Sequence, residues 1–344
     1  MTHTRVLWTL ARVRLLVFVL LLVGLGAGMG HWDRALGPQK PAALGLTVVA
    51  WSLLHVGTMW LNATLDRDDG PVLLGASVPP PPWLGVVAQG LLLCVPCVGF
   101  AVNREVGQLA VVASGLSWLY SHPMTAWKGH PLLGPLVNVL GYGVVSPLAG
   151  FYALGLPITW RVLAIVPVVG SGVLAVYFAA QAFQENEDRV RGYQTFVAMF
   201  GGRETIDAAR IMLTASGLWL MGLVTLGWLP LELCSVLLPM WWTEQGLRGW
   251  KAQDEIAYGG MMVFTRRLVM TVLVGVIAVG QAHLDAMTAG GPVAGLATRA
   301  GHPPDRPRLS PASLFLWEVQ HRRQVAWPAE TRQDSQEARV EDTP

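Results

Sequence analysis

Long apolar segments separated by short polar ones dominate the pattern of this chain. Nine such segments lie at residues 12–30, 42–62, 83–102, 107–121, 132–154, 157–182, 206–227, 229–243 and 264–284. A helix needs about 20 apolar residues to cross the roughly 30 Å hydrocarbon core of a bilayer. The pattern therefore predicts an all-α, polytopic membrane protein with about nine transmembrane helices.

Two features of this pattern leave boundaries open. The fourth and eighth segments are short, and the seventh meets the eighth at Gly227-Trp228-Leu229-Pro230. The first segment follows Arg12 and Arg14 as in a signal peptide. The many spans after it favour a transmembrane helix instead.

Composition supports a membrane protein. The 344 residues are 53% hydrophobic and only 13% charged, with 38 Gly, 23 Pro and 15 Trp. Soluble domains carry about 25% charged residues, and the mean hydropathy of +0.45 is correspondingly high. These values exclude a soluble enzyme, a nucleic-acid-binding protein and a disordered chain. The net charge of +2 is too small to imply an anionic partner by itself, and three cysteines cannot form a disulfide framework.

The distribution of basic residues predicts the orientation. With the N-terminus inside, thirteen Lys and Arg residues fall in inside segments, and four fall in outside loops: Arg34, Lys40, Arg104 and Arg161. Cytoplasmic loops are enriched in Lys and Arg. We therefore expect an integral membrane protein, of the bacterial inner-membrane type, with a cytoplasmic N-terminus.

The C-terminal segment differs from the rest of the chain. Residues 287–344 are rich in Pro, Gly, Arg and Glu, with one moderately apolar stretch at Ser313–Trp317. Such composition is typical of disordered segments. The sequence thus predicts a transmembrane domain at residues 1–286 and a mostly disordered polar tail at 287–344.

An acidic cluster lies at the end of the second apolar segment. Asn62, Asp66 and Asp69 fall within about 60° of one another on a helical wheel. One helix end therefore presents an amide and two carboxylates to the same place.

A second acidic cluster, with Gln184, Glu185 and Asp188, ends the sixth segment on the same predicted side. Oxygen ligands from two facing groups suit Mg²⁺ that also shares phosphate oxygens with a substrate. Either cluster alone is more typical of solvated charges at a helix end. The pair together favours a metal site.

A third polar segment follows the fourth apolar segment, from Tyr120 to Pro131. Lys128 could neutralise a diphosphate, and Tyr120 could form a hydrogen bond to it. An ordinary positively charged interfacial loop explains this segment equally well.

These residues resemble the UbiA family of intramembrane prenyltransferases. Tyr120, Ser121, Pro123, Lys128 and Pro131 match the family's Y-S-x-P-P-x-R-x-K-x-x-P loop, and residues 188–195 resemble its D-R-x-x-G-x-x-T segment. The two acidic clusters stand where that family has its aspartate motifs. The sequence departs from those motifs in having Ala63, Gly70, Gln181 and Gln184 in place of aspartates, and Ala126 in place of the loop arginine.

The resemblance implies a nine-helix UbiA-like bundle and Mg²⁺-dependent transfer of an isoprenyl group from an isoprenyl diphosphate to a lipophilic acceptor. It implies Asp66 and Asp188 as principal metal ligands, with Asp69 and Glu185 as further ones. Asn62 would orient the metal ligands, and Ser121 belongs to the substrate loop. Lys128, Arg67 and Arg189 would balance the diphosphate, and Tyr120 and Tyr177 would face a carbocation.

Other functions remain open. The same fold could cyclise a terpene, with internal capture of the cation. The reduced aspartate motifs favour a non-catalytic relative that binds an isoprenoid. An unrelated transporter would predict an internal repeat of spans, of which the sequence gives little sign.

Overall fold

The computed structural model describes residues 3–32, 40–66, 78–155 and 157–289 of the chain. Within these residues, all regular secondary structure is helical. The helices are α1 (His3–Leu10), α2 (Val13–His31), α3 (Lys40–Asp66), α4 (Leu84–Val102), α5 (Arg104–Ser121), η1 (Trp127–Gly129), α6 (Leu133–Asn138), η2 (Val139–Val145), α7 (Ser146–Ala153), α8 (Trp160–Ala182), α9 (Glu185–Val190), α10 (Phe196–Phe200), α11 (Gly202–Thr225), η3 (Leu231–Val236), α12 (Leu237–Lys251) and α13 (Tyr258–Ala289).

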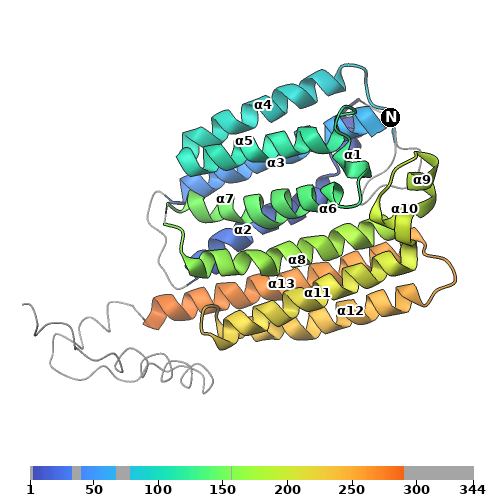
Figure 1. Cartoon of the computed structure of the whole chain (residues 1–344). Coiled ribbons are helices and arrows are strands. Elements are labelled where there is room, and N and C mark those ends of the chain that lie inside the picture. The colour runs from blue at the N-terminus through green and yellow to red at the C-terminus, as the bar shows by residue number, and fades with distance from the viewer. Residues whose placement is uncertain (1–2, 33–39, 67–77, 156, 290–344) are drawn as a thin grey trace, which may run out of the picture. The chain divides into compact units, whose positions relative to one another are not determined.

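The long helices lie side by side in one bundle (Figure 1). Among the described residues, seven segments are long and apolar enough to cross a membrane: α2, α3, α4, the passage from α6 to α7, α8, α11 and α13. The other two predicted spans correspond to α5 and α12. Both pack against these helices, and each carries charged residues near one end. The prediction of an all-α membrane bundle with about nine transmembrane helices is confirmed.

The uncertain boundary between the seventh and eighth segments is a turn. Helix α11 ends at Thr225, and Gly227 adopts a φ of +68°, a conformation that glycine reaches without steric cost. After this turn, Pro230 precedes the next helical segment, η3. The tail predicted after residue 286 lies outside the described residues from residue 290 onward, and its disorder remains a prediction.

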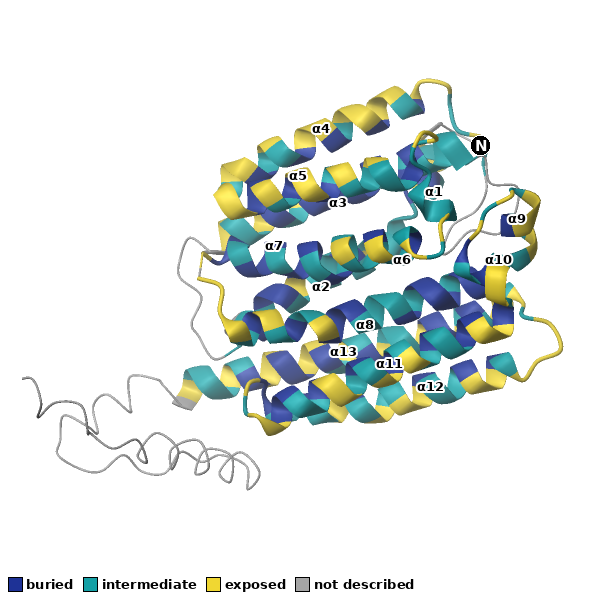
Figure 2. Cartoon of the chain, in the orientation of Figure 1, coloured by how far each residue is buried: buried dark blue, intermediate teal, exposed yellow. Residues whose placement is uncertain are grey.

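The helices form two groups, each with its own buried core. One core joins α2, α3, α4, α5 and α7 around Trp51, which is fully buried. The second group consists of α8, α11, α12 and α13, whose aliphatic and aromatic residues form two further clusters, one of which also includes Met29 of α2. Figure 2 shows buried residues on the helix faces that meet and exposed ones on the outer faces. An outer apolar surface of this kind is suited to lipid.

A π-turn interrupts the passage from α6 to α7. Residues Val139–Val145 have π-helical geometry. The hydroxyl of Ser146 donates to the carbonyl of Gly141 at 2.8 Å, and the indole N–H of Trp51 donates to Ser146 Oγ at 3.0 Å. The buried Trp51 side chain therefore supports the widened turn from α3. Such turns occur frequently at functional sites.

Glycines allow α2 and α7 to approach closely. A Cβ atom at Gly26 would overlap the carbonyl oxygen of Pro147, and one at Gly150 would overlap the carbonyl oxygen of Val23. Small residues at helix contacts let backbones approach closely in membranes, where the lipid supplies no hydrophobic force between helices. This contact holds α2 against the rest of its group.

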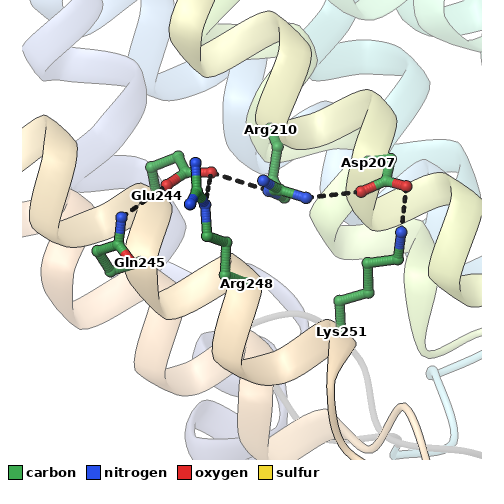
Figure 3. A network of polar contacts seen from close by, with 6 residues as sticks. All are labelled: Asp207, Arg210, Glu244, Gln245, Arg248 and Lys251. Atoms are coloured by element: carbon green, nitrogen blue, oxygen red, sulfur yellow. Dashed lines mark hydrogen bonds and ion pairs between the residues drawn. The ribbon is translucent and has the colours of Figure 1, made fainter.

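Charged residues connect α11 to α12 near one end of the bundle (Figure 3). Arg210 on α11 donates from Nε to Glu244 at 2.9 Å and from Nη1 to Asp207 at 2.9 Å. Lys251 pairs with Asp207, and Arg248 pairs with Glu244 at 2.7 Å. Each pair is partly exposed and individually weak, but together they fix the antiparallel register of these two helices.

The close approach of α2 and α7 gives a test of the packing. Gly150→Ala should lower the free energy of unfolding by about 3 kcal/mol, because backbone must move to admit the methyl group. Gly24→Ala is the matched control, since a Cβ there has no atom within 4 Å. The thermal unfolding midpoint in detergent measures both variants. Equal midpoints for the two variants would contradict the packing described here.

Candidate functional site

A cavity of about 450 Å³ is lined by residues from both groups of helices. Five charged residues line it: Arg12, Asp66, Lys128, Asp188 and Arg191. We call the last four of these, Asp66, Lys128, Asp188 and Arg191, the ionic end. Most of the remaining lining consists of aliphatic side chains from α2, α8, α11 and α13. The cavity therefore joins a charged compartment to an apolar one.

Asp66 is the last residue of α3 and forms an ion pair with Lys128 on η1. Both side chains are nearly buried, at 6% and 10% exposure. Asn62 lies one turn before Asp66 and also lines the cavity, and the hydroxyl of Ser121 donates to its Oδ1 at 3.2 Å. The structure thus brings together four residues that the sequence had singled out.

Asp188 lies on α9 and lines the same cavity as Asp66. Its carboxylate is 8% exposed and accepts a hydrogen bond of 2.6 Å from the Thr195 hydroxyl. Burial raises the pKa of Asp188, while the Thr195 hydrogen bond and the charges of Arg191 and Lys128 oppose that rise. Burial likewise lowers the pKa of Lys128. Both groups therefore favour a neighbour of opposite charge.

Two loops meet at the ionic end. The backbone N–H of Gln194 donates to the carbonyl of Gly129 at 2.9 Å, and Lys128 Nζ lies 5.9 Å from the centroid of the Tyr193 ring. A Cβ atom at Gly129 would lie 2.8 Å from Tyr193 Cδ1, so glycine allows this contact. The loop that carries Lys128 is thereby fixed to the loop that follows Asp188.

Aromatic and amide groups line the cavity next to the ionic end. Tyr120 and Tyr177 both line it. The side-chain amide of Gln181 donates to Tyr177 Oη at 2.8 Å, while Gln181 Oε1 is buried without a hydrogen-bond partner. A buried acceptor without a partner carries a desolvation cost. Gln181 can therefore accept a ligand at this position.

Two predicted site residues lie elsewhere. Glu185 Oε2 accepts a hydrogen bond of 2.9 Å from the backbone N–H of Gly202, and Oε1 pairs with Arg189 at 2.9 Å. Neither Glu185 nor Arg189 is among the residues that line the cavity. Glu185 thus caps the N-terminus of α11 rather than facing Asp66. The predicted residues Arg67 and Asp69 lie outside the described residues.

Sequence reasoning missed Arg191 and Tyr193. Arg191 is three residues after Asp188, which places it on the same side of a helix, and it lines the cavity. It also pairs with Glu187 at 2.7 Å. This spacing is the signal that would have favoured Arg191 over Arg189.

The donor set suits a hydrated Mg²⁺ ion. Within the described residues, no three His, Cys, Asp or Glu side chains are close enough to hold a metal ion by themselves. Mg²⁺ usually binds one or two carboxylates, water and substrate phosphates. Asp66, Asp188 and the free amide oxygen of Gln181 meet that requirement for an ion that also contacts phosphate.

The family model described as the UbiA prenyltransferase family matches residues 15–266. Comparison with curated protein sequences gives no significant match.

Solved structures of UbiA homologues share the fold. A UbiA homologue from Archaeoglobus fulgidus bound to Cd²⁺ has a TM-score of 0.60 and 14% identity, over 79% of this chain and 98% of that one. The same homologue bound to GPP and Mg²⁺ gives 0.56 and 15%, over 80% and 99%. Digeranylgeranylglyceryl phosphate synthase gives 0.58 and 12%, over 81% and 99%. At these identities the likeness establishes the fold.

The contact between the two loops gives a second test. Gly129→Ala should displace the Tyr193 ring and weaken the hydrogen bond from Gln194. Hydrogen exchange at the Gln194 amide should then accelerate about tenfold, as measured by mass spectrometry. Gly115→Ala on α5, where a Cβ meets no atom within 4 Å, is the control. Unchanged exchange in Gly129→Ala would show that the contact does not hold the loops.

Proposed function

The chain belongs to the UbiA prenyltransferase family, and we propose that it transfers an isoprenyl group from an isoprenyl diphosphate to a lipophilic acceptor within the membrane. The observation that carries this proposal is the cavity, which connects the ionic end to a long apolar compartment. An isoprenyl diphosphate has the same two parts, a charged head and a hydrocarbon tail.

The fixed cations of the ionic end would hold the diphosphate. Lys128 and Arg191 both line the cavity, and charge-assisted hydrogen bonds to phosphate are among the stronger ones in proteins. Lys128 pairs with Asp66 in this structure. On substrate binding, its ammonium would contact both the carboxylate and a phosphate oxygen.

Asp66 and Asp188 would hold Mg²⁺, with Gln181 as a further oxygen donor. The Archaeoglobus homologue binds GPP and Mg²⁺, which supports an isoprenyl diphosphate and Mg²⁺ as the molecules bound here. When bound, Mg²⁺ would supply positive charge to the diphosphate as it becomes the leaving group. Asn62, fixed by Ser121, orients the end of α3 that presents Asp66. Roles for Arg67 and Asp69 in this set remain predictions.

The residues next to the ionic end are suited to an allylic carbocation. When the bond between carbon and diphosphate oxygen breaks, the electron pair stays on the oxygen and the carbon becomes cationic. Tyr120 and Tyr177 line the cavity there, and aromatic faces attract cations. The Tyr177 hydroxyl accepts from Gln181, which fixes its position. The apolar walls beyond exclude water, which would otherwise capture the cation.

We further infer that the ionic end faces the cytoplasm. The distribution of Lys and Arg favours an N-terminus on the inside, and with alternating spans α3, α5 and α8 would all end on that side. A cytoplasmic ionic end would receive a water-soluble diphosphate head while the acceptor enters from the lipid.

The proposal can be tested by following diphosphate release from geranylgeranyl diphosphate in detergent with a membrane lipid extract. Wild-type protein should release diphosphate with Mg²⁺ and stop when EDTA removes the metal. Asp66→Asn and Asp188→Asn should each reduce release by about 100-fold or more, because each removes a carboxylate charge that would hold Mg²⁺ next to the leaving group. Asp254→Asn, an exposed loop residue, is the control.

The products distinguish the alternatives. A labelled acceptor lipid supports transfer, whereas a cyclic hydrocarbon formed without acceptor indicates a terpene cyclase. Binding of the diphosphate without Mg²⁺-dependent release, in protein shown to be folded by size-exclusion chromatography, indicates a non-catalytic relative.

A further inference from the structure

Away from the ionic end, the cavity continues as a channel with walls on α2, α8 and α13. The lining runs from Leu15 to Met29 on α2, from Gln181 back to Val168 on α8, and from Met261 to Gly275 on α13. Near their upper ends, α8 and α13 meet where Phe183 contacts Tyr258, with ring centroids 5.1 Å apart. We call this part of the cavity the apolar channel.

The three walls have nearly the same depth. From first to last residue they advance 14, 13 and 14 positions along their helices, and an α-helix rises 1.5 Å per residue, so each wall is about 20 Å long. At the lower end, Met29, Val168 and Leu233 line the cavity and belong to one buried cluster. These side chains form the floor of the apolar channel.

Three hydroxyl groups that line the cavity, those of Thr265, Thr271 and Ser216, are satisfied within the protein. Thr265 Oγ1 donates to the carbonyl of Met261 at 2.8 Å, and Thr271 Oγ1 donates to that of Arg267 at 3.0 Å. Ser216 Oγ donates to the carbonyl of Val168 at 2.7 Å. The walls therefore direct no free donor at these positions toward the channel, which suits a hydrocarbon chain.

We propose that the apolar channel is four isoprene units long and that the preferred donor is therefore a C20 isoprenyl diphosphate. Each isoprene unit adds four chain bonds of about 1.5 Å and extends a stretched chain by about 5 Å. Four units therefore reach the floor, whereas the two units of a C10 chain fill half of the depth. This inference rests on the proposed function and specifies its substrate.

Gly172 offers a way to shorten the channel. It lies nine residues before Gln181 on α8, about 14 Å below it along the helix, and it lines the cavity. A Cβ added there would meet only Ser216 Oγ, at 3.7 Å. Leucine at this position would fill the channel at the third unit without forcing the backbone to move.

The experiment compares C10, C15 and C20 isoprenyl diphosphates on full-length protein in detergent, with Mg²⁺ and the membrane lipid extract that supplies the acceptor. Binding is measured by calorimetry, and kcat/KM by diphosphate release. In the wild type, kcat/KM should be at least about tenfold higher for C20 than for C10, because the longer chain buries more apolar surface. Gly172→Leu should reduce this C20 to C10 ratio at least about tenfold. Gly90→Leu, an exposed α4 glycine whose Cβ has no atom within 4 Å, should keep the wild-type ratio.

Each outcome separates the two proposals. If no chain length binds or releases diphosphate, the proposed function fails. If all three lengths react equally in the wild type, or if Gly172→Leu leaves the ratio unchanged, diphosphate chemistry stands and the channel inference is overturned. A change in the ratio that Gly90→Leu shares would also overturn it, because that residue lies outside the channel.

Discussion

The buried ion pair between Lys128 and Asp66 determines how the ionic end is arranged. Breaking a buried pair by removing one partner costs about 3–5 kcal/mol, since the remaining charge has lost its water. Lys128 lies on a loop that is joined to the loop after Asp188 through Gly129 and Gln194. The pair therefore connects the end of α3 to the end of α8, and it sets where Asp66 stands relative to Asp188.

The carboxylates of the ionic end face at least as many cations before any ligand enters. Asp66 and Asp188 contribute two negative charges, Lys128 and Arg191 contribute two positive ones, and Arg12 also lines the cavity. A diphosphate brings further negative charge into a site with little access to water, where charges interact strongly. A divalent cation would offset that added negative charge, which gives the two carboxylates a use beyond pairing with their own cations.

The sequence was sufficient for the features that follow from helical periodicity. Apolar segments of about 20 residues predicted the spans, and the spacing of Asn62 and Asp66 correctly placed both on one side of α3 at the cavity. Periodicity could not place Glu185, because the chain turns between α8 and α9 and begins a new helix at that residue. There the carboxylate satisfies a free N–H at the start of α11. The π-turn depends on a contact from Trp51, 95 residues away from Ser146, which no local pattern encodes.

That π-turn also sets the register of α7. A π-turn holds one residue more than an α-turn, and each residue turns a helix by about 100°. Asn138, Gly141 and Tyr142 line the cavity around it, whereas Gly150 beyond it packs against Val23. Rewinding Val139–Val145 as an ordinary α-helix, with every residue kept, would turn α7 by about 100°. A residue with a side chain would then face Val23. The same π-turn therefore fixes both the shape of the cavity wall and the packing of α2.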